Sequence, residues 1–117
     1  MDRERVDDDR ADRSERLSVE LMGGPTPTLV VVGDLDAYTV GVLEQELRNL
    51  DADSEVRIDL SGVAFMDSSG IRVLVRLDNS LRESGRQLTL SAPSAPVLRL
   101  FELTALVGRF HIDPSAP

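Results

Sequence analysis

Two adjacent serines, Ser68 and Ser69, lie between an aspartate and a glycine in the segment MDSSG, residues 66–70. A serine hydroxyl can cap a helix, attack a carbonyl group, contact a phosphate or receive one. The segment follows an apolar alternation typical of a strand and precedes the spacing of an amphipathic helix. We therefore expect both hydroxyl groups at the N-terminus of a helix.

Nucleophilic hydrolysis is the first chemistry that these serines allow. It needs a general base, and the one histidine of the chain is His111, in RFHID near the C-terminus. Neither serine lies in a GxSxG turn, which presents the nucleophile in many hydrolases. A lone histidine at a terminal strand is typical of a surface residue, so we expect a protein that is not an enzyme.

Four carboxylates fall near predicted strand ends, where oxygen ligands can bind Mg²⁺: Asp34, Asp36, Asp59 and Asp67. A phosphate-accepting receiver domain has such a pocket, but it also uses a lysine, and this chain contains none. Aspartates at these positions are typical of turns and helix caps. Because the nucleotide-binding motifs GxxxxGK and GxGxxG are also missing from the sequence, we expect neither a metal nor a cofactor.

Helix capping is the simplest role for the MDSSG segment. Asp67 or Ser68 as the N-cap would accept a hydrogen bond from a free backbone amide, a contribution of about 1 kcal/mol. Capping leaves Gly70 unexplained, because a glycine in the first turn costs up to ~1 kcal/mol relative to alanine. We expect Gly70 to let the backbone approach a neighbouring strand or a binding partner closely.

A helix N-terminus also tolerates a phosphoryl group, since its amides and its dipole favour an anion. Arg72 lies four residues after Ser68, one helical turn on. A phosphoryl group on Ser68 would add about −1.5 to −2 charges to an exposed surface and block docking there without unfolding the domain. We expect Ser68 to face solvent and Ser69 to turn toward the sheet or the backbone.

The helix that follows has two apolar sides. One is a stripe expected to face the core: Ile71, Leu74, Val75 and Leu81. Val73 and Leu77 project to another side, which is either buried under a neighbouring segment or contacts a partner. The arginines of this helix are interleaved with Asp78 and Glu83, which indicates a solvated face rather than a basic patch.

Apolar patterning predicts the elements around this site. Strands are expected near residues 17–21, 28–35, 55–61 and 86–92, with a short last strand near 108–113, and helices over 36–50, 67–85 and 91–106. The turn GGPTP predicts an antiparallel first hairpin, and the alternation of strands and helices after it predicts parallel connections. Because three strands alternate apolar and polar residues, the helices should lie mainly on one face. The sequence predicts an α/β domain with a mixed sheet of four to five strands.

The 117 residues fit a single domain. Residues 1–16 carry seven acids and five arginines around one valine, which predicts a disordered charged tail, followed by the domain at 17–112 and a frayed C-terminus at 113–117. The net charge of −8 argues against nucleic acid and anionic membranes as partners. With zero cysteines and no apolar run long enough to span a membrane, we expect a cytoplasmic protein that binds another soluble protein.

Three segments resemble bacterial anti-sigma factor antagonists of the STAS domain family: GDLDAYT at 33–39, VRIDLSGVAFMDSSGIRVLV at 56–75 and PSAPVLRLFELTALVGRF at 93–110. The resemblance runs in order from about residue 17 to residue 112 and implies a STAS-like single domain. The chain departs from it at Ile71 and Arg72, where the family often has Leu-Gly.

The resemblance implies partner switching. In this family, the unphosphorylated antagonist binds an anti-sigma factor, usually a serine kinase, and so releases a sigma factor; the kinase then phosphorylates the antagonist, and a serine phosphatase resets it. Motif matching makes Ser68 the phosphoacceptor and places Asp36 beside it. The expected partner-binding residues are Asp36, Asp67, Ser68, Ser69, Gly70, Arg72, Val73 and Leu77. The alternative is a STAS scaffold or adaptor subunit of a larger signalling or transport assembly, without a phosphoswitch.

Overall fold

The computed structural model describes residues 16–23, 26–50 and 55–115, so the predicted tail lies outside the described residues apart from Arg16. Five strands form one sheet: β1 (Leu17–Met22), β2 (Thr28–Leu35), β3 (Val56–Met66), β4 (Leu88–Ser91) and β5 (His111–Asp113). Three helices accompany it: α2 (Val40–Arg48), α3 (Ser68–Glu83) and α4 (Ala95–Leu103). The described part confirms the predicted order of elements.

The strands lie side by side in the order in which they occur in the chain, β1-β2-β3-β4-β5. β1 and β2 form the predicted antiparallel hairpin, and the other three pairings are parallel. The sheet is therefore mixed, as the sequence indicates. β3 is longer than predicted because its second half stays paired with β2 as far as Met66, which lies opposite Leu35. The register of this pairing is irregular at two points.

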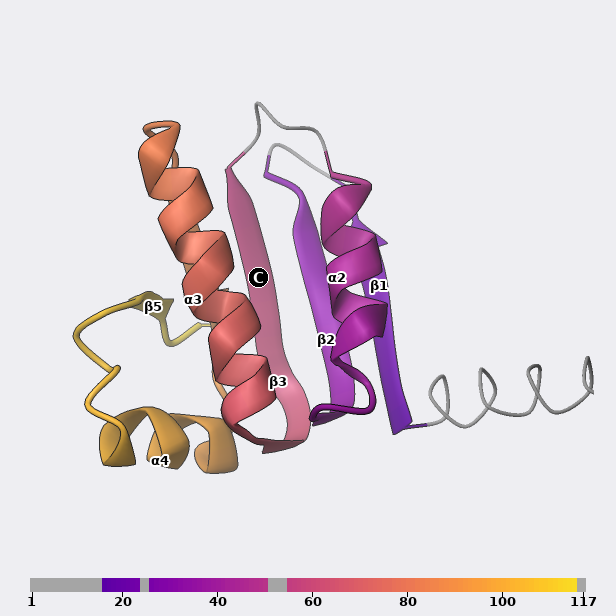
Figure 1. The fold of residues 1–117 in the computed structure, drawn as a ribbon, viewed down its shortest axis with the longest axis vertical. Coiled ribbons are helices and arrows are strands. Elements are labelled where there is room, and N and C mark those ends of the chain that lie inside the picture. Colours follow the sequence, from indigo (N-terminus) through magenta and orange to yellow (C-terminus); the bar gives the residue numbers. More distant parts are fainter. Residues whose placement is uncertain (1–15, 24–25, 51–54, 116–117) are drawn as a thin grey trace, which may run out of the picture.

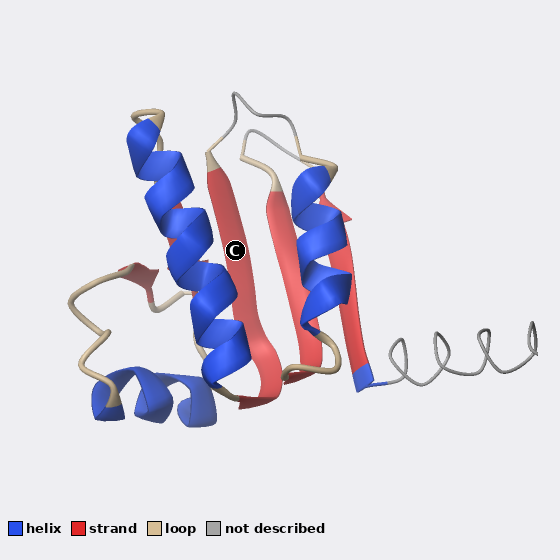
Figure 2. Cartoon of the chain, viewed as in Figure 1, coloured by secondary structure: helices blue, strands red, loops and turns tan. Residues whose placement is uncertain are grey.

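Two helices cover one face of the sheet. Figure 1 shows α2 and α3 running across the same face, with their N-termini at the end where β2 and β3 finish, and Figure 2 shows the same layering by element type. α4 lies at that same end and packs beside β3 (Figure 1). The prediction of helices mainly on one face is confirmed. No helix in the described residues is long and apolar enough to cross a bilayer.

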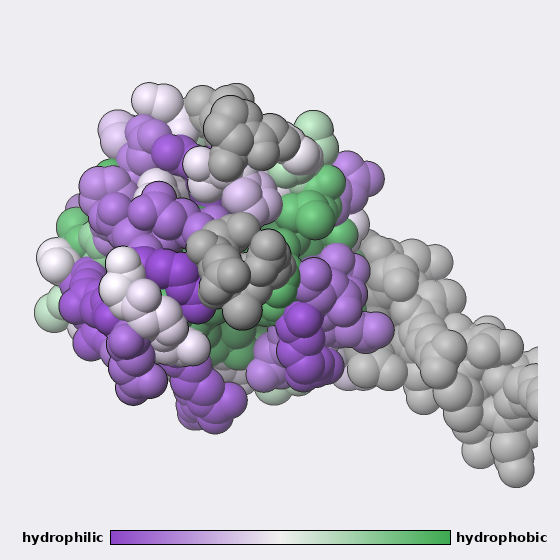
Figure 3. All heavy atoms as spheres, turned by 90° about the horizontal axis from the view of Figure 1, so that it is seen from above, coloured by the Kyte–Doolittle hydropathy of each residue, from purple (hydrophilic) through white to green (hydrophobic). Residues whose placement is uncertain are grey.

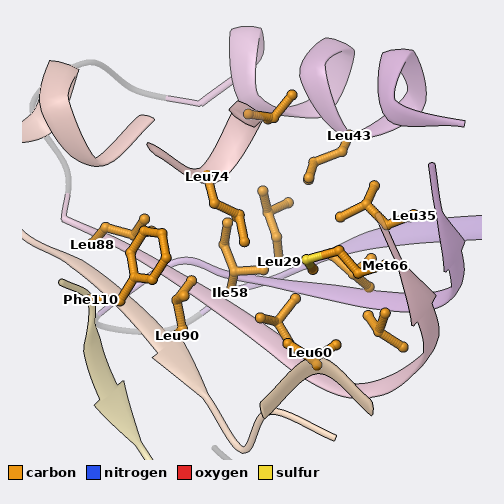
Figure 4. Close-up of a cluster of buried hydrophobic side chains, with 14 of the residues drawn as sticks. Leu29, Leu35, Leu43, Ile58, Leu60, Met66, Leu74, Leu88, Leu90 and Phe110 are labelled. Atoms are coloured by element: carbon orange, nitrogen blue, oxygen red, sulfur yellow. The ribbon is translucent and has the colours of Figure 1, made fainter. Parts of the chain in front are cut away.

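Aliphatic side chains from the helices and the sheet meet between the two layers. Leu43 of α2 and Leu74 of α3 point toward Leu29 and Ile58 of the sheet (Figure 4). All four side chains are fully buried, and burying a leucine or isoleucine stabilises a fold by about 1.5 to 3 kcal/mol. This core fixes α2 and α3 on the sheet and thereby positions their N-termini.

A buried carboxylate joins α3 to the segment after α4. Asp78 is 3 % exposed, and its Oδ2 lies 3.1 Å from Nε of Arg82 and 3.1 Å from Nε of Arg109. Arg109 also donates to the side chain of Asn79, and Arg82 donates to the Arg109 carbonyl at 2.9 Å. The expectation of a wholly solvated face is wrong at Asp78, because residues after α4 fold back over this side of α3.

Side-chain contacts on the face of the sheet opposite α2 and α3 hold the edge strand β5 in place. Arg57 of β3 donates to Ser91 Oγ at 3.0 Å and to Asp113 Oδ2 at 2.9 Å. Hydrogen bonds hold the pKa of Asp113 below its usual range, with the larger contribution from the Ser115 amide and the next from Arg57. Asp113, expected to begin the frayed end, thus belongs to β5.

Candidate functional site

The junction between β3 and α3 is built around Asp67. This residue is the N-cap of α3, and its Oδ1 accepts a hydrogen bond from the Ser69 amide at 2.8 Å. Its own amide donates to the Leu35 carbonyl at 3.2 Å, at the end of β2. Of the two caps that the sequence allowed, the structure selects Asp67. The cap also ties the start of α3 to the loop that leaves β2.

That neighbouring loop, between β2 and α2, is organised by Asp36. Its Oδ1 accepts hydrogen bonds from the amides of Tyr38 at 2.9 Å and Thr39 at 3.1 Å, and lies 3.2 Å from the Thr39 hydroxyl oxygen. The Thr39 hydroxyl in turn donates to the Asp34 carbonyl at 2.7 Å, and Thr39 is fully buried. Asp36 is therefore fixed in this turn through Oδ1, whereas its second carboxylate oxygen, Oδ2, points away from the turn.

The electrostatics of Asp36 follow from these contacts. Partial burial by itself raises the pKa of its carboxyl, but hydrogen bonds from the backbone of Thr39 and Tyr38, and then the charge of Arg16, outweigh that effect and hold the pKa below its usual range. Asp36 is therefore charged at neutral pH and presents a negative group at the edge of the sheet.

Parallel pairing brings the two loops together. Leu35 pairs with Met66 at the carboxyl ends of β2 and β3, so the residues that follow them, Asp36 and Asp67, leave the sheet at the same edge. Ser68 is exposed there and Ser69 is half-buried, in agreement with the predicted difference in exposure between the two residues. Figure 3 views the opposite end of the molecule, where hydrophilic residues cover most of the coloured surface.

The structure separates the other predicted site residues by burial. Arg72 is exposed and Leu77 is half-buried, so both remain accessible. Val73 is only 7 % exposed, because its side of α3 faces α2. Gly70 is buried as well. Both residues are packed inside the domain in this structure, and their contact with a partner stays a prediction.

Gly70 has an internal reason to be glycine. A Cβ atom there would lie 2.8 Å from Met66 Cγ and 3.0 Å from Leu35 Cγ, so a side chain would collide with the ends of β3 and β2. Of the two explanations that the sequence left open, the close approach to neighbouring strands is the one that the structure contains.

Replacing Gly70 by alanine should destabilise the domain by about 1 to 2 kcal/mol. Overpacking a core costs roughly 1 to 3 kcal/mol, and the better helix propensity of alanine returns up to ~1 kcal/mol. Urea unfolding measures the difference. Gly41→Ala in α2 is the matched control, since nothing lies within 4 Å of its added Cβ and it should not destabilise. Equal effects at both glycines would contradict the packing explanation.

Sequence reasoning missed two features of this region. Arg16 was assigned to the tail, yet its guanidinium reaches the Asp36 loop. An open groove between the end of β3 and α4 was also missed; it is lined in part by Phe65, Leu98 and Leu103, all of which are exposed. The one signal for this groove in the sequence is that α4 carries more large apolar residues than a single buried stripe requires.

Three of the four aspartates considered as metal ligands accept hydrogen bonds from backbone amides, whereas the carboxylate of the fourth, Asp34, lies 3.9 Å from Arg16. Asp59 accepts from the Ser61 amide at 2.9 Å, in the same way that Asp36 and Asp67 accept from amides two residues on. This confirms their interpretation as turn formers and caps. His111 is exposed in β5, whereas Ser68 follows β3, two strands away in the sheet.

The domain has a mixed sheet with two helices across one face, and an exposed serine directly after the N-cap aspartate of α3 at the carboxyl edge. Residues 18–111 match the family described as "Mlab, STAS domain". The chain belongs to the STAS domain family, which confirms the resemblance drawn from the sequence.

Several relatives that match this chain are named anti-sigma factor antagonists. The chain is 38% identical over 80 residues to the anti-sigma-B factor antagonist of Listeria monocytogenes, covering 67% of this chain and 70% of that one. It is 33% identical over 85 residues to the protein of the same name from Staphylococcus aureus, covering 71% and 79%. A solved anti-sigma factor antagonist from Mycobacterium paratuberculosis has a TM-score of 0.75 at 26% identity, covering 85% of this chain and 86% of that one.

Proposed function

We propose that this protein is an anti-sigma factor antagonist whose partner is an anti-sigma factor of the serine-kinase type. Binding would release a sigma factor, phosphorylation of Ser68 would end binding, and a serine phosphatase would restore it. The protein itself acts by binding and not by catalysis. The observation that carries the proposal is the exposed Ser68 hydroxyl at the N-terminus of α3, directly after the capping Asp67.

The position of Ser68 supports a switch. The Asp67 carboxylate caps the helix without using the Ser68 hydroxyl, so a phosphoryl group on Ser68 leaves the cap intact. The free amides of the first turn favour the added anion. At the same time, about −1.5 to −2 charges appear beside Asp36 and Asp67 on the docking edge. The expected effect is to block docking without unfolding the domain, because the charged phosphoryl group would have to lose its water at the interface.

The proposed docking surface uses the accessible residues of this edge. It comprises Asp36, Asp67, Ser68, Arg72 and Leu77, with Ser69 half-buried beside them. Leu77 lies with Leu47 in a shallow groove between α3 and α2, more than two helical turns along α3 from the charged loops, and extends the surface by an apolar contact. Apolar contact at the centre and charges at the rim are typical of protein interfaces.

Purification from the source cell tests the proposal. Intact mass and peptide mapping should find a single phosphoryl group at Ser68 in part of the protein, and a kinase-fold anti-sigma factor should co-purify with the unphosphorylated form. Recovery of the protein as a subunit of a large signalling or transport assembly, with Ser68 unmodified, would replace the proposal by the scaffold alternative.

Arg72 is a charged rim residue of the docking surface, so Arg72→Ala should leave partner binding by the unmodified protein nearly unchanged. It should speed dephosphorylation by up to about fivefold. The reason is that Arg72 lies one turn after Ser68, is exposed, and can pair with the phosphoryl group, and an exposed ion pair contributes about 0.2 to 1 kcal/mol. Rates measured with the purified phosphatase check this. Arg76→Ala, one turn further on, is the control, and equal rates for both variants and the parent would rule out the pairing.

A further inference from the structure

Arg16, the residue before β1, lies beside the end of β2 and contacts the Asp36 loop. Its guanidinium donates to Asp36 Oδ2, lies 3.9 Å from the Asp34 carboxylate, and sits 5.3 Å from the centre of the Tyr38 ring. A planar carboxylate, a second acid and an aromatic face are the groups that recognise a guanidinium. These three side chains together form a guanidinium-binding site.

The site does not depend on Arg16 for its shape. Asp36 divides its two oxygens, because Oδ1 is held by Tyr38 and Thr39 whereas Oδ2 faces Arg16. Thr39 is also anchored to the Asp34 carbonyl. Removing the Arg16 side chain therefore leaves the turn assembled and Oδ2 available to another cation.

The position of Arg16 is nevertheless fixed by the hairpin. Leu17 pairs with Gly33, which has a φ of +116°, and a Cβ atom on Gly33 would lie 2.0 Å from the Arg16 carbonyl oxygen. Glycine thus permits the close approach of the Arg16 backbone at this point. The Arg16 side chain is 41% exposed, so water can solvate it and another cation can reach the carboxylate that it contacts. The contact is placed by the fold but is weak enough to exchange.

We propose that Asp34, Asp36 and Tyr38 form a guanidinium site that Arg16 fills in the free protein and vacates when a cationic side chain of the docking partner enters. Arg16 is thus an intramolecular competitor that lowers the affinity of the docking edge for its partner. The existence of the site rests on the contacts of Arg16 alone, and only the identity of the incoming cation rests on the proposed function. An exposed pair contributing up to ~1 kcal/mol corresponds to competition of up to about fivefold.

The site is tested with N-acetyl-L-arginine amide as the probe, followed by the amide signals of Tyr38 and Thr39 in two-dimensional NMR spectra. Arg16→Ala should give a saturable shift with an apparent affinity several-fold higher than that of the parent. Arg16→Gln should behave in the same way, because it keeps a comparable stem without the charge. The double variant Arg16→Ala with Asp36→Asn should lose the response, and N-acetyl-L-alanine amide should produce none.

Equal responses of the parent and Arg16→Ala, or a full response in the double variant, would overturn the site. This assay contains no anti-sigma factor, so its result is independent of the proposed function. A second titration uses the partner recovered by co-purification, which Arg16→Ala should bind up to about fivefold more tightly than the parent does. Unchanged or weaker binding there would overturn the competition while leaving the guanidinium site in place.

Discussion

Replacing Ser68 by alanine is expected to abolish phosphate incorporation by the anti-sigma factor kinase and to keep partner binding, which yields a permanently active antagonist. The hydroxyl removed is the exposed one, and it takes no part in the cap that Asp67 makes to the Ser69 amide. Stability should therefore stay within about ±0.5 kcal/mol, as for surface substitutions in general. Phosphate incorporation with the purified kinase, alongside a binding titration, measures both effects.

Two further variants make this result specific. Ser69→Ala should be phosphorylated like the parent, since its hydroxyl is half-buried and not the acceptor. Ser68→Asp should weaken binding about tenfold or more, equivalent to ~1.4 kcal/mol, because it places a charge at the docking edge. Full incorporation into Ser68→Ala would falsify the assignment of the site. Unchanged affinity of Ser68→Asp would remove the electrostatic explanation.

The double variant Arg82→Ala with Arg109→Ala should destabilise the domain by about 3 to 5 kcal/mol, the cost of leaving a buried charge without its partners. Asp78 is 3 % exposed, and within residues 16–23, 26–50 and 55–115 its ion pairs are with these two arginines. Asp78→Ala should cost less, about 1 to 3 kcal/mol, because the arginine side chains it leaves are 58% and 33% exposed and can turn into water. Guanidinium chloride unfolding gives both values.

The control for this comparison is Arg72→Ala with Arg76→Ala, which removes the same charge from exposed positions of the same helix. It should change the free energy of unfolding by less than about 1 kcal/mol. Removing Asp78 together with both arginines should recover part of the loss seen in the double variant. If the double variant is no less stable than Asp78→Ala, the buried carboxylate does not depend on these partners.

Features set by local periodicity could be predicted from the sequence. Spacing, capping and turn chemistry within a few residues predict the α3 stripe, a helix end at Gly85 and the exposed Ser68. In the structure Ser68 is exposed, Leu74 and Leu81 of the stripe are buried while Ile71 and Val75 are half-buried, and α3 ends at Glu83. The mixed sheet also follows, because one hairpin and several alternating strands leave few other arrangements. The principal candidate residues therefore came from local signals.

Features that depend on distant segments could not be predicted in this way. Val73 is buried because α2 packs along its side of α3, and one helix does not reveal what covers its second apolar side. Asp78 looked solvated because its partner Arg109 lies 31 residues away. Arg16 meets Asp36 only through the register of β1 on β2. Each of these contacts requires tertiary pairing that composition and periodicity do not encode.

Neighbours in the sheet are also neighbours in the chain, and this bears on how the protein is made. A chain leaving the ribosome presents its N-terminal part first, and contacts between consecutive segments form with little loop-closure entropy. Each strand can therefore pair with the strand synthesised just before it, without inserting between two others. Both loops of the docking edge are complete once α3 ends at Glu83, whereas Arg109 emerges later to join Asp78. We expect a ribosome-bound nascent chain to assemble its binding edge before it acquires its full stability.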